Sequence, residues 1–284
     1  MTHAATRVAI QGEAGAFSHE AARRVYGPGV QVVACETFDA LFDAVSDGSA
    51  DAGMVPVENT LAGAVQRPMD LLLTPGLTAV AETRVAVRLH LAARPGASLE
   101  TLRSAASHPV ALQQCLRFFR EHPHIERHTS YDTAGSIRDA MQAGRPEAGI
   151  GSELAAELYG AEILVRDVQD HAENHTRFLA VVARDRTEVD GALPPGVHPK
   201  TSIAFTVAHT PGALHRALGC FADAGVDLSR VESRPIPGQP WEYRFYTDLR
   251  GATPEDQDAA MERLRALGGR VVVIGRYREE VPEG

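Results

Sequence analysis

Short apolar runs alternate with amphipathic helical patterns through about the first 185 residues, and this alternation constrains the fold more than any other feature. It is typical of an α/β fold layered around a largely parallel sheet. Apolar side chains at helical spacing predict helices at residues 38–46 and 112–119. The predicted strands are residues 7–11, 30–35, 52–55, 85–93, 104–107, 125–129, 148–150 and 177–182.

One long apolar stretch, residues 77–94, is interrupted only by single polar residues. It is suited to cross from one lobe to another as an extended connector, and the strand after Thr176 is suited to cross back. Two crossings would give a bilobed body with a cleft at the hinge, a favoured place for ligands. Periodicity alone leaves this topology open.

The last third of the chain has a different element order. Residues 190–200 are rich in proline and glycine, which break both regular structures, so we predict a linker there. Beyond it the pattern predicts the order βαββαβ, a ferredoxin-like domain. Its strands are residues 202–208, 228–235, 243–248 and 270–277, and its helices are residues 212–224 and 254–267.

Bulk properties favour small-molecule chemistry inside the cell. A chain of 284 residues suits two domains, and a net charge of -9 argues against a nucleic-acid partner. Cys35, Cys115 and Cys220 form no paired motif, which favours a reducing, cytoplasmic location. The start lacks a signal peptide, and no run reaches the roughly 18 apolar residues of a membrane span.

The glycine-rich segment of residues 12–18 follows the first strand and opens a helix. Gly12 and Gly15 let a ligand approach the backbone, and free amides at a helix start attract anions. The segment lacks the ending of a phosphate-binding loop, so a carboxylate is the better ligand. A tight turn with Ser18 as the helix cap is the alternative.

Polar residues follow the third predicted strand. We expect Pro56 to end the strand and Thr60 to cap a helix from Leu61, which leaves Asn59 pointing from the strand end. Glu58 is a general acid if burial raises its pKa, or else a partner of an arginine. Capping with a structural ion pair explains the same residues.

Ser107 closes another strand, and we expect Gln114 in the first turn of the next helix, where an amide both donates and accepts. An exposed glutamine is the plainer alternative. We expect no metal site at His122, His124 and His128, because Pro123 and the intervening charges place these histidines in a loop before a strand. We likewise expect His171 and His175, near Thr176, to have no role in the site.

Three segments together resemble the active-site segments of prephenate dehydratases: Asn174 to Phe178, Val55 to Thr60 and Ser107 to Cys115. The resemblance covers nearly the whole chain. It departs from the family pattern at Thr60, where serine is usual, at Val110, where glutamine is common, and at Ala14, where proline is frequent. The first two differences weaken the transfer of individual polar contacts.

The resemblance implies decarboxylative dehydration of prephenate to phenylpyruvate, in a bilobed body like that of periplasmic binding proteins, with no cofactor. It implies that Thr176 assists the departing hydroxyl, that Asn59 and Gln114 position the ring substituents, and that Glu58 joins a proton relay. For substrate binding it implies Gly15, Phe17, Ser18, Thr60, Ser107, Thr133, Arg177 and Phe178, although Phe178 also suits the core.

The C-terminal pattern resembles ACT domains, which implies that phenylalanine binds between two such domains and inhibits a homodimer or homotetramer. The effector residues implied are Gly212, Ala213, Leu214, Glu232, Ser233, Arg234 and Pro235. We expect a catalytic domain at residues 1–188, with its second lobe at about residues 90–170, and an ACT domain at residues 200–280. Only six residues precede the first strand, so we expect a monofunctional enzyme.

Two other functions fit the sequence. Arogenate dehydratase acts on a substrate with an amino group in place of the keto group, and kinetics on both substrates separate the two. A bilobed, non-catalytic sensor would bind a ligand without turnover, and the Thr176-Arg177-Phe178 motif counts against it.

Overall fold

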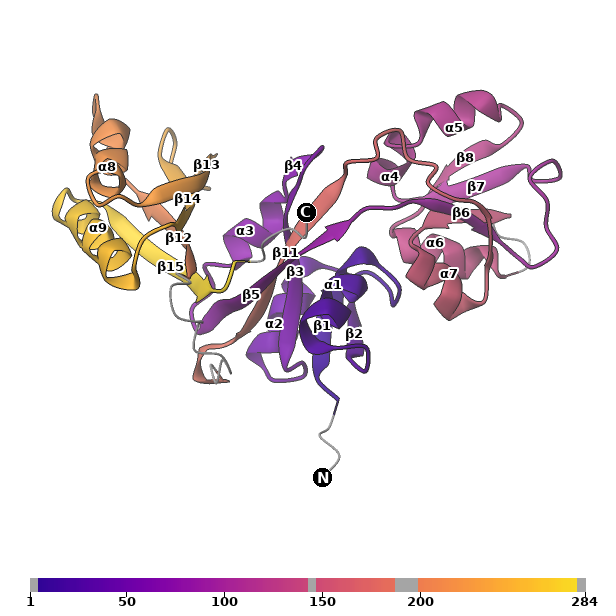
Figure 1. Ribbon diagram of the computed structural model, residues 1–284, viewed down its shortest axis with the longest axis horizontal. Coiled ribbons are helices and arrows are strands. Elements are labelled where there is room, and N and C mark those ends of the chain that lie inside the picture. Colours follow the sequence, from indigo (N-terminus) through magenta and orange to yellow (C-terminus); the bar gives the residue numbers. More distant parts are fainter. Residues whose placement is uncertain (1–4, 143–146, 187–198, 280–284) are drawn as a thin grey trace. The chain divides into compact units, whose positions relative to one another are not determined.

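The computed structural model describes residues 5–142, 147–186 and 199–279, and forms two compact units (Figure 1). Unit 1 comprises Met1–Leu71 and Thr83–Val181, and unit 2 comprises Leu72–Glu82 and Val182–Gly284. The predicted linker at residues 190–200 falls almost entirely outside the described residues, so the domain boundary there stays a prediction.

The first lobe of unit 1 is built on the strand order β5-β11-β3-β1-β2, with β4 beside β3. β1 pairs parallel with β2 and β3, whereas β11 returns antiparallel to β3. The strands are β1 (Arg7–Gln11), β2 (Gln31–Cys35), β3 (Ala52–Asn59), β4 (Gly63–Ala64), β5 (Leu77–Ala86, begun in unit 2) and β11 (His175–Ala183). The helices are α1 (Phe17–Tyr26), α2 (Phe38–Ser46) and α3 (Gln66–Leu71).

The second lobe is a five-stranded sheet in the order β10-β6-β9-β7-β8. Its strands are β6 (His90–Ala93), β7 (Ser104–Ser107), β8 (Glu126–Thr129), β9 (Ala148–Gly151) and β10 (Glu162–Val165). Its helices are α4 (Pro109–Gln113), α5 (Leu116–Glu121), α6 (Thr133–Ala140) and α7 (Glu153–Tyr159), drawn on both sides of the sheet in Figure 1. The chain enters this lobe between β5 and β6 and leaves it between β10 and β11, so the two-crossing, bilobed topology is confirmed.

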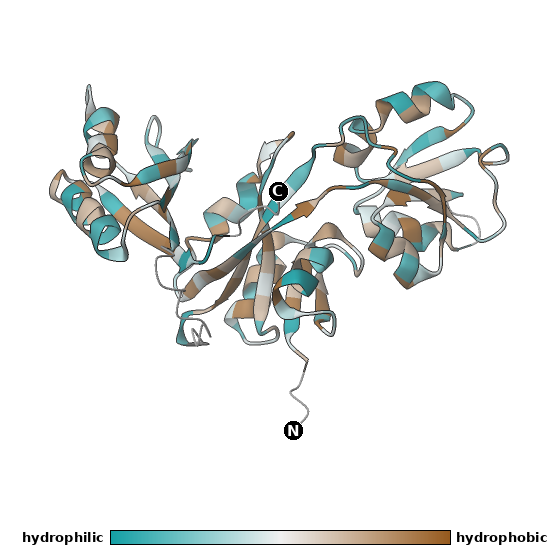
Figure 2. Ribbon diagram, in the orientation of Figure 1, coloured by the Kyte–Doolittle hydropathy of each residue, from teal (hydrophilic) through white to brown (hydrophobic). Residues whose placement is uncertain are grey.

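Unit 2 has the predicted βαββαβ order. It runs β12 (Lys200–Thr206), α8 (Ala213–Ala222), β13 (Asp227–Pro235), β14 (Tyr243–Arg250), α9 (Pro254–Ala266) and β15 (Arg270–Tyr277), after a short 3-10 turn η1 (Arg184–Arg186). The strand order β13-β14-β12-β15 is that of a ferredoxin-like sheet. Figure 2 shows α9 polar on one side and apolar on the other, as expected for a helix on a sheet face.

Three local predictions are wrong. The predicted strand at residues 85–93 is broken, because β5 ends at Ala86 and β6 begins at His90 in the other sheet. The predicted helix at residues 112–119 is two helices, α4 and α5, separated at Gln114 and Cys115. β3 continues through Pro56 to Asn59, because a bulge at Val57 of β3 lets it keep pairing with β11, with Phe178 opposite Pro56 and Arg177 opposite Glu58.

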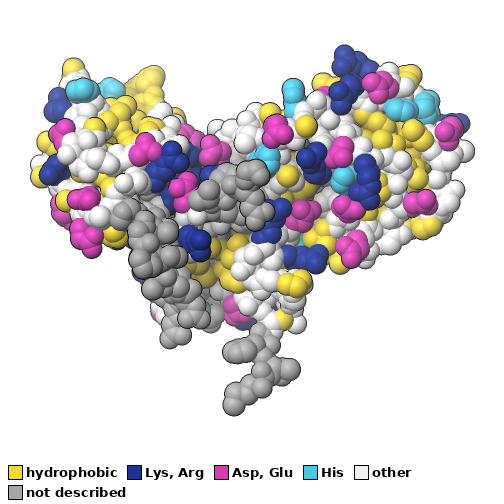
Figure 3. Space-filling view, in the orientation of Figure 1, with side chains coloured by type: hydrophobic (Ala, Val, Ile, Leu, Met, Phe, Trp, Pro, Cys, Tyr) yellow, Lys and Arg dark blue, Asp and Glu magenta, His cyan; other side chains and the backbone are white. Residues whose placement is uncertain are grey.

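No described helix is long and apolar enough to span a membrane. On the face drawn in Figure 3, acidic and basic side chains are interspersed rather than gathered by sign. This face lacks the continuous basic stripe with which nucleic-acid-binding proteins contact phosphates.

Candidate active site

Asn59, at the end of β3, has a side-chain orientation fixed by the backbone. Its Oδ1 accepts hydrogen bonds from the N–H groups of Leu61 and Ala62, at 3.0 and 2.8 Å. A backbone N–H can only donate, so the atom facing it must be the oxygen. The prediction that Thr60 caps a helix from Leu61 is wrong, since Asn59 caps a turn there and α3 begins only at Gln66.

The Asn59 amide then holds Thr176, its cross-strand neighbour on β11. Asn59 Nδ2 donates to Thr176 Oγ1 at 3.0 Å, to Asn174 Oδ1 at 2.8 Å and to the His175 carbonyl at 3.2 Å. With three acceptors for two hydrogens, and both oxygen lone pairs in use, Asn59 has no capacity left for a substrate. Asn59 therefore positions Thr176.

The Thr176 hydroxyl is left as a donor. Its oxygen accepts from Asn59, and no described residue accepts its hydrogen. The side chain is half-buried, so the O–H is available to a bound molecule in a partly dehydrated place. Hydrogen bonds of a prepositioned donor are stronger in such a place than in water.

Gln114 follows the last residue of α4, so the prediction that it lies in the first turn of a helix is wrong, and it is brought to the same place from the second lobe. Asn174 Nδ2 donates to Gln114 Oε1 at 3.1 Å, so the amides of Asn59, Asn174 and Gln114 form one chain that crosses between the lobes. We call these three residues with Thr176 the amide cluster. The sequence gives no signal for a role of Asn174; its complete burial, which only the fold reveals, is what singles it out.

Thr60, Glu58 and Arg177 lie beside the amide cluster. Thr60 Oγ1 accepts from the His175 N–H at 3.0 Å, so Thr60 holds β11 in place. The general-acid role of Glu58 required burial, but its side chain is 43% exposed. Glu58 lies 3.9 Å from the guanidinium of Arg177, which is 6% exposed, so the ion-pair alternative has geometric support.

In the glycine loop, residues 12–18, some of the backbone N–H groups are already engaged within the protein. The Gly15 N–H donates to His19 Nδ1 at 3.0 Å, and the Ala16 N–H donates to the Glu13 carbonyl at 3.0 Å. A Cβ on Gly15 would lie 2.7 Å from Cα of Ala155 in α7. The loop is therefore packed against the second lobe.

Hydrogen bonds and ion pairs complete this loop contact. Ser152 Oγ donates to the Gly15 carbonyl at 2.5 Å, and Tyr159 Oη donates to the Ala14 carbonyl at 2.9 Å. Glu13 accepts from Tyr131 at 2.5 Å and pairs with Arg138 at 2.7 Å. The Tyr131 hydroxyl and then Arg138 lower the pKa of Glu13 against the opposing effect of burial.

The remaining predicted binding residues are buried or packed within the two lobes, or lie in their helices. The Ser107 hydroxyl is fully buried and donates to the Ile150 carbonyl at 2.6 Å, inside the second-lobe sheet. Phe178 is 2% exposed, and Phe17 packs against the core of the second lobe. Ser18 is buried in α1, which it does not cap because α1 begins at Phe17, and Thr133 is the first residue of α6.

No group of three or more possible metal ligands lies together among the described residues. His122 stacks on Phe118 with ring centroids 4.6 Å apart, and His128 lies 3.8 Å from Glu126. Burial lowers the pKa of His19. This histidine was not singled out from the sequence, and it serves as the acceptor for the Gly15 amide.

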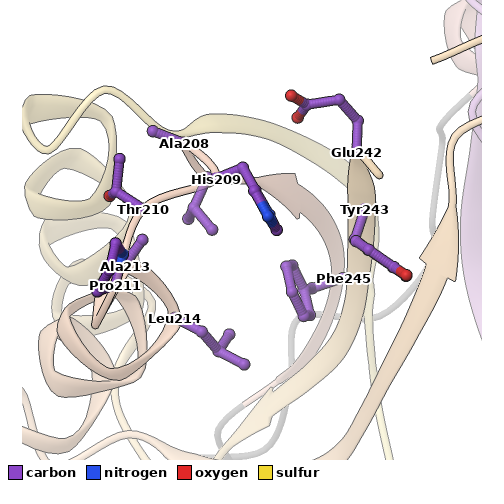
Figure 4. A pocket seen from close by; sticks show the side chains of 10 residues that line it. Ala208, His209, Thr210, Pro211, Ala213, Leu214, Glu242, Tyr243 and Phe245 are labelled. Carbon is purple, nitrogen blue, oxygen red and sulfur yellow. The ribbon is translucent and has the colours of Figure 1, made fainter. Parts of the chain in front are cut away.

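Unit 2 contains a cavity of about 350 Å³ at the start of α8 (Figure 4). Its lining residues are Val207, Ala208, His209, Thr210, Pro211, Ala213, Leu214, Glu242, Tyr243 and Phe245. Of the predicted effector residues, only Ala213 and Leu214 line it, and Gly212 precedes them with a φ of 76°.

The strand register explains why Glu232 is not in this cavity. Glu232 lies opposite Tyr246, whereas Ser233 and Pro235 lie opposite Phe245 and Tyr243, which line the cavity. Neighbouring residues of a strand face opposite sides of a sheet, so Glu232 and Arg234 point to the other face. Glu232 there pairs with Arg230 at 2.5 Å.

These features define a class of protein: a two-lobed α/β enzyme with a held hydroxyl donor where the chain crosses between lobes, followed by a ferredoxin-like unit with its own cavity. The family model for prephenate dehydratase matches residues 8–186. The chain belongs to the prephenate dehydratase family.

The similarity to known proteins extends beyond the segment that the family model matches. "Arogenate dehydratase/prephenate dehydratase 2, chloroplastic" of Arabidopsis thaliana is 36% identical, covering 95% of this chain and 72% of its own. The prephenate dehydratase of Arthrobacter aurescens, solved in complex with L-Phe, superposes with a TM-score of 0.83 at 30% identity over 96% of this chain and 90% of that one. A solved protein described as GqqA, a novel type of quorum quenching acylase, also gives 0.83, at 35% identity over 96% and 98%.

Proposed function

We propose that this chain converts prephenate to phenylpyruvate, carbon dioxide and water, with Thr176 as the hydrogen-bond donor to the departing hydroxyl. The observation that carries the assignment of Thr176 is the Asn59 amide, which donates to Thr176 Oγ1 and so leaves the Thr176 O–H directed away from Asn59. Loss of the ring carboxylate as carbon dioxide supplies the electron pair that completes the aromatic ring. The oxygen of the departing hydroxyl leaves as water, and so gains a proton.

A threonine hydroxyl is a weak acid, so its contribution is a prepositioned hydrogen bond that strengthens as charge develops on the departing oxygen. Arg177, 6% exposed beside the site, is suited to a carboxylate, because a guanidinium forms paired hydrogen bonds with one. Acyl transfer has less support, because no described histidine or carboxylate accepts a hydrogen bond from Thr176 to activate it as a nucleophile.

The test is a direct assay of the purified chain with prephenate, in which phenylpyruvate is measured by absorbance. Arogenate is assayed side by side, with phenylalanine as the product. We expect the chain to turn over prephenate, with a kcat/KM higher than its kcat/KM for arogenate. Turnover of arogenate alone would make the chain an arogenate dehydratase, and ligand binding without turnover of either would make it a sensor.

We further propose that L-phenylalanine binds the cavity of unit 2, the ACT domain, and inhibits turnover. Glu242 meets the ammonium group, the first-turn N–H groups of α8 meet the carboxylate, and Leu214 and Phe245 hold the ring. Glu232 lies on the face of β13 that is turned away from the cavity. It would therefore contact a ligand only where a second subunit packs against that face. We also propose that the chain assembles as a homodimer or homotetramer and is located in the cytoplasm.

Calorimetry and inhibition kinetics with L-phenylalanine test this regulation. Coupling free energies of about 1 to 3 kcal/mol predict a severalfold or larger change in prephenate affinity or rate. Glu242→Gln should weaken phenylalanine binding and leave turnover without phenylalanine unchanged, while Glu232→Gln reports on a site between subunits. Equal phenylalanine affinity in wild type and both variants would place the ligand elsewhere.

A further inference from the structure

We propose that Asn174 is a positioning residue that sets the orientation of the Gln114 amide, so that Gln114 presents its NH2 group, and not its oxygen, to the substrate. The inference rests on the proposed dehydratase function, because it concerns the substrate of the same site. Asn174 is 0% exposed and so acts through Gln114, without touching the substrate itself.

The orientation follows from backbone groups at one end of the amide chain. The N–H groups of Leu61 and Ala62 fix the oxygen of Asn59, so the Asn59 NH2 group faces Asn174. The atom of Asn174 that receives it must be the oxygen, at 2.8 Å, which leaves the Asn174 NH2 group for Gln114, at 3.1 Å. Gln114 therefore turns its oxygen inward.

The outward group of Gln114 is then Nε2, which has no hydrogen-bond partner among the described residues and belongs to a half-buried side chain. Prephenate carries two carboxylates, a keto oxygen and a hydroxyl, so it offers mostly hydrogen-bond acceptors. A donor complements these groups, whereas an amide oxygen in the same place would repel them.

The main chain of Asn174 is itself anchored where the two crossings meet. Its carbonyl accepts from the Val87 N–H at 2.7 Å, and Val87 lies on the outgoing crossing. The Gln114 carbonyl likewise accepts from the Asp170 N–H at 2.6 Å. Because both backbones are held, the separation of the Asn174 and Gln114 side-chain amides is fixed. The hydrogen bond between them then keeps the orientation that the Leu61 and Ala62 N–H groups impose on Asn59.

The principal test is Asn174→Asp, which keeps the shape and changes the polarity. An ionised carboxylate cannot donate, so Gln114 must turn its NH2 group inward and its oxygen toward the substrate. We expect kcat/KM for prephenate to fall about 100-fold at neutral pH, the scale for losing one oriented donor. A protonated carboxyl has the same donor and acceptor as an amide, so activity relative to wild type should recover as the pH falls. A ratio that is constant with pH would overturn the proposal.

Gln114→Glu tests the same orientation from the accessible side, which matters if Asn174→Asp does not fold. The glutamate still accepts from Asn174 but offers the substrate an oxygen, so we again expect a loss of about 100-fold with recovery in acid. Gln113→Glu is the matched control, because Gln113 is the exposed neighbour on α4. If both glutamate variants keep wild-type activity, the proposal is wrong.

Failure of the dehydratase function is distinguished by the wild-type assay run beside the variants. If wild type turns over neither prephenate nor arogenate, the hydrogen bond between Asn174 and Gln114 is tested by measuring stability instead. The effects of Asn174→Asp and Gln114→Ala on chemical unfolding should then be non-additive, because the second removes the partner through which the first acts. Additive effects would contradict this hydrogen bond.

Discussion

The lobes of unit 1 meet through two polar contacts of different chemistry, the amide cluster and the glycine loop. In the amide cluster every link is a neutral amide or hydroxyl, and each has a defined donor and acceptor end. In the loop contact, Glu13 and Arg138 form an ion pair beside buried backbone carbonyls. Each neutral amide fixes the donor and acceptor orientation of the next amide, whereas the ion pair and close packing mainly hold two surfaces together.

The difference decides where a substrate donor can arise. In the loop, the Gly15 N–H is engaged by His19, and the Gly15 and Ala14 carbonyls accept from Ser152 and Tyr159 of the second lobe, so these groups are not offered to a carboxylate. The amide cluster uses its acceptors internally and leaves two donors, the Thr176 hydroxyl and the Gln114 NH2 group. We therefore expect changes in the cluster to alter turnover and changes in the loop to alter stability.

The largest expected effect is that of Thr176→Ala on turnover. Loss of a positioned donor should lower kcat by about 10² to 10⁴ fold, whereas Thr176→Ser should keep much more activity because it retains the hydroxyl. Thermal unfolding should change little, since the side chain is half-buried at a strand end. Near wild-type kcat in a folded Thr176→Ala protein would show that the cluster does not act through this hydroxyl.

The next effect, on stability, is that of Gly15→Ala in the loop. Gly15 has a φ of 93°, and the new Cβ would lie 2.7 Å from Cα of Ala155. Gly27→Ala is the matched control, because Gly27 has a φ of 88° with nothing within 4 Å of its Cβ position. Both variants carry the backbone strain of about 1 to 2 kcal/mol. Gly15→Ala should lose about 1 to 3 kcal/mol more by overpacking, measured by chemical denaturation; equal losses would mean that the lobes separate without cost.

The sequence predicted the layers and crossings well, because apolar periodicity and breakers are local signals. It also placed Asn59, Gln114 and Thr176 near one another, through their resemblance to a family. It did not predict the break at Gln114 or the passage of β3 through Pro56, because both depend on partners far along the chain, Asp170 and β11.

The glycine loop shows the same limit in a second form. Glycines at a helix start suit either a ligand or a neighbouring helix, and only the position of Ala155 shows what occupies the space. The role of Asn174 was hidden for a related reason, since donor direction is set by a chain of contacts that starts at Leu61 and Ala62.

Two acidic residues near the loop should give opposite pH dependences of stability. Burial raises the pKa of Glu20 to about 7, against opposing effects of Arg24, Arg23 and Ser152, while Glu153 adds to the rise. The folded state thus keeps this proton to higher pH than the unfolded chain, so Glu20 costs stability above about pH 7 and the cost fades toward pH 4.5. Glu20→Gln should be more stable than wild type at pH 8 by about 1 to 3 kcal/mol, and equal to it near pH 4.5.

Glu13→Gln is the contrasting variant. Because the pKa of Glu13 is lowered, its contribution is present above its ordinary pKa and is lost as the pH falls through the folded value. Glu13→Gln should therefore be less stable than wild type at neutral pH, with the difference shrinking in acid. Unfolding midpoints of both variants, taken at constant ionic strength from pH 8 to well below the ordinary pKa of 4.5, measure the two trends; parallel curves would contradict them.

The smallest expected effect is that of Tyr159→Phe, which removes one hydrogen bond of the loop contact. The Tyr159 hydroxyl donates to the Ala14 carbonyl at 2.9 Å, so its loss should cost about 0.5 to 1.5 kcal/mol. Tyr26→Phe is the matched control, because the Tyr26 hydroxyl is buried with no hydrogen-bond partner among the described residues. Removing a buried, unpaired hydroxyl should be neutral or stabilising, so the two substitutions should shift the free energy of unfolding in different directions. Chemical denaturation at pH 7 resolves differences of this size when both curves share one slope. Equal destabilisation by the two changes would mean that Tyr159 contributes packing alone, and that the loop holds the lobes without this bond.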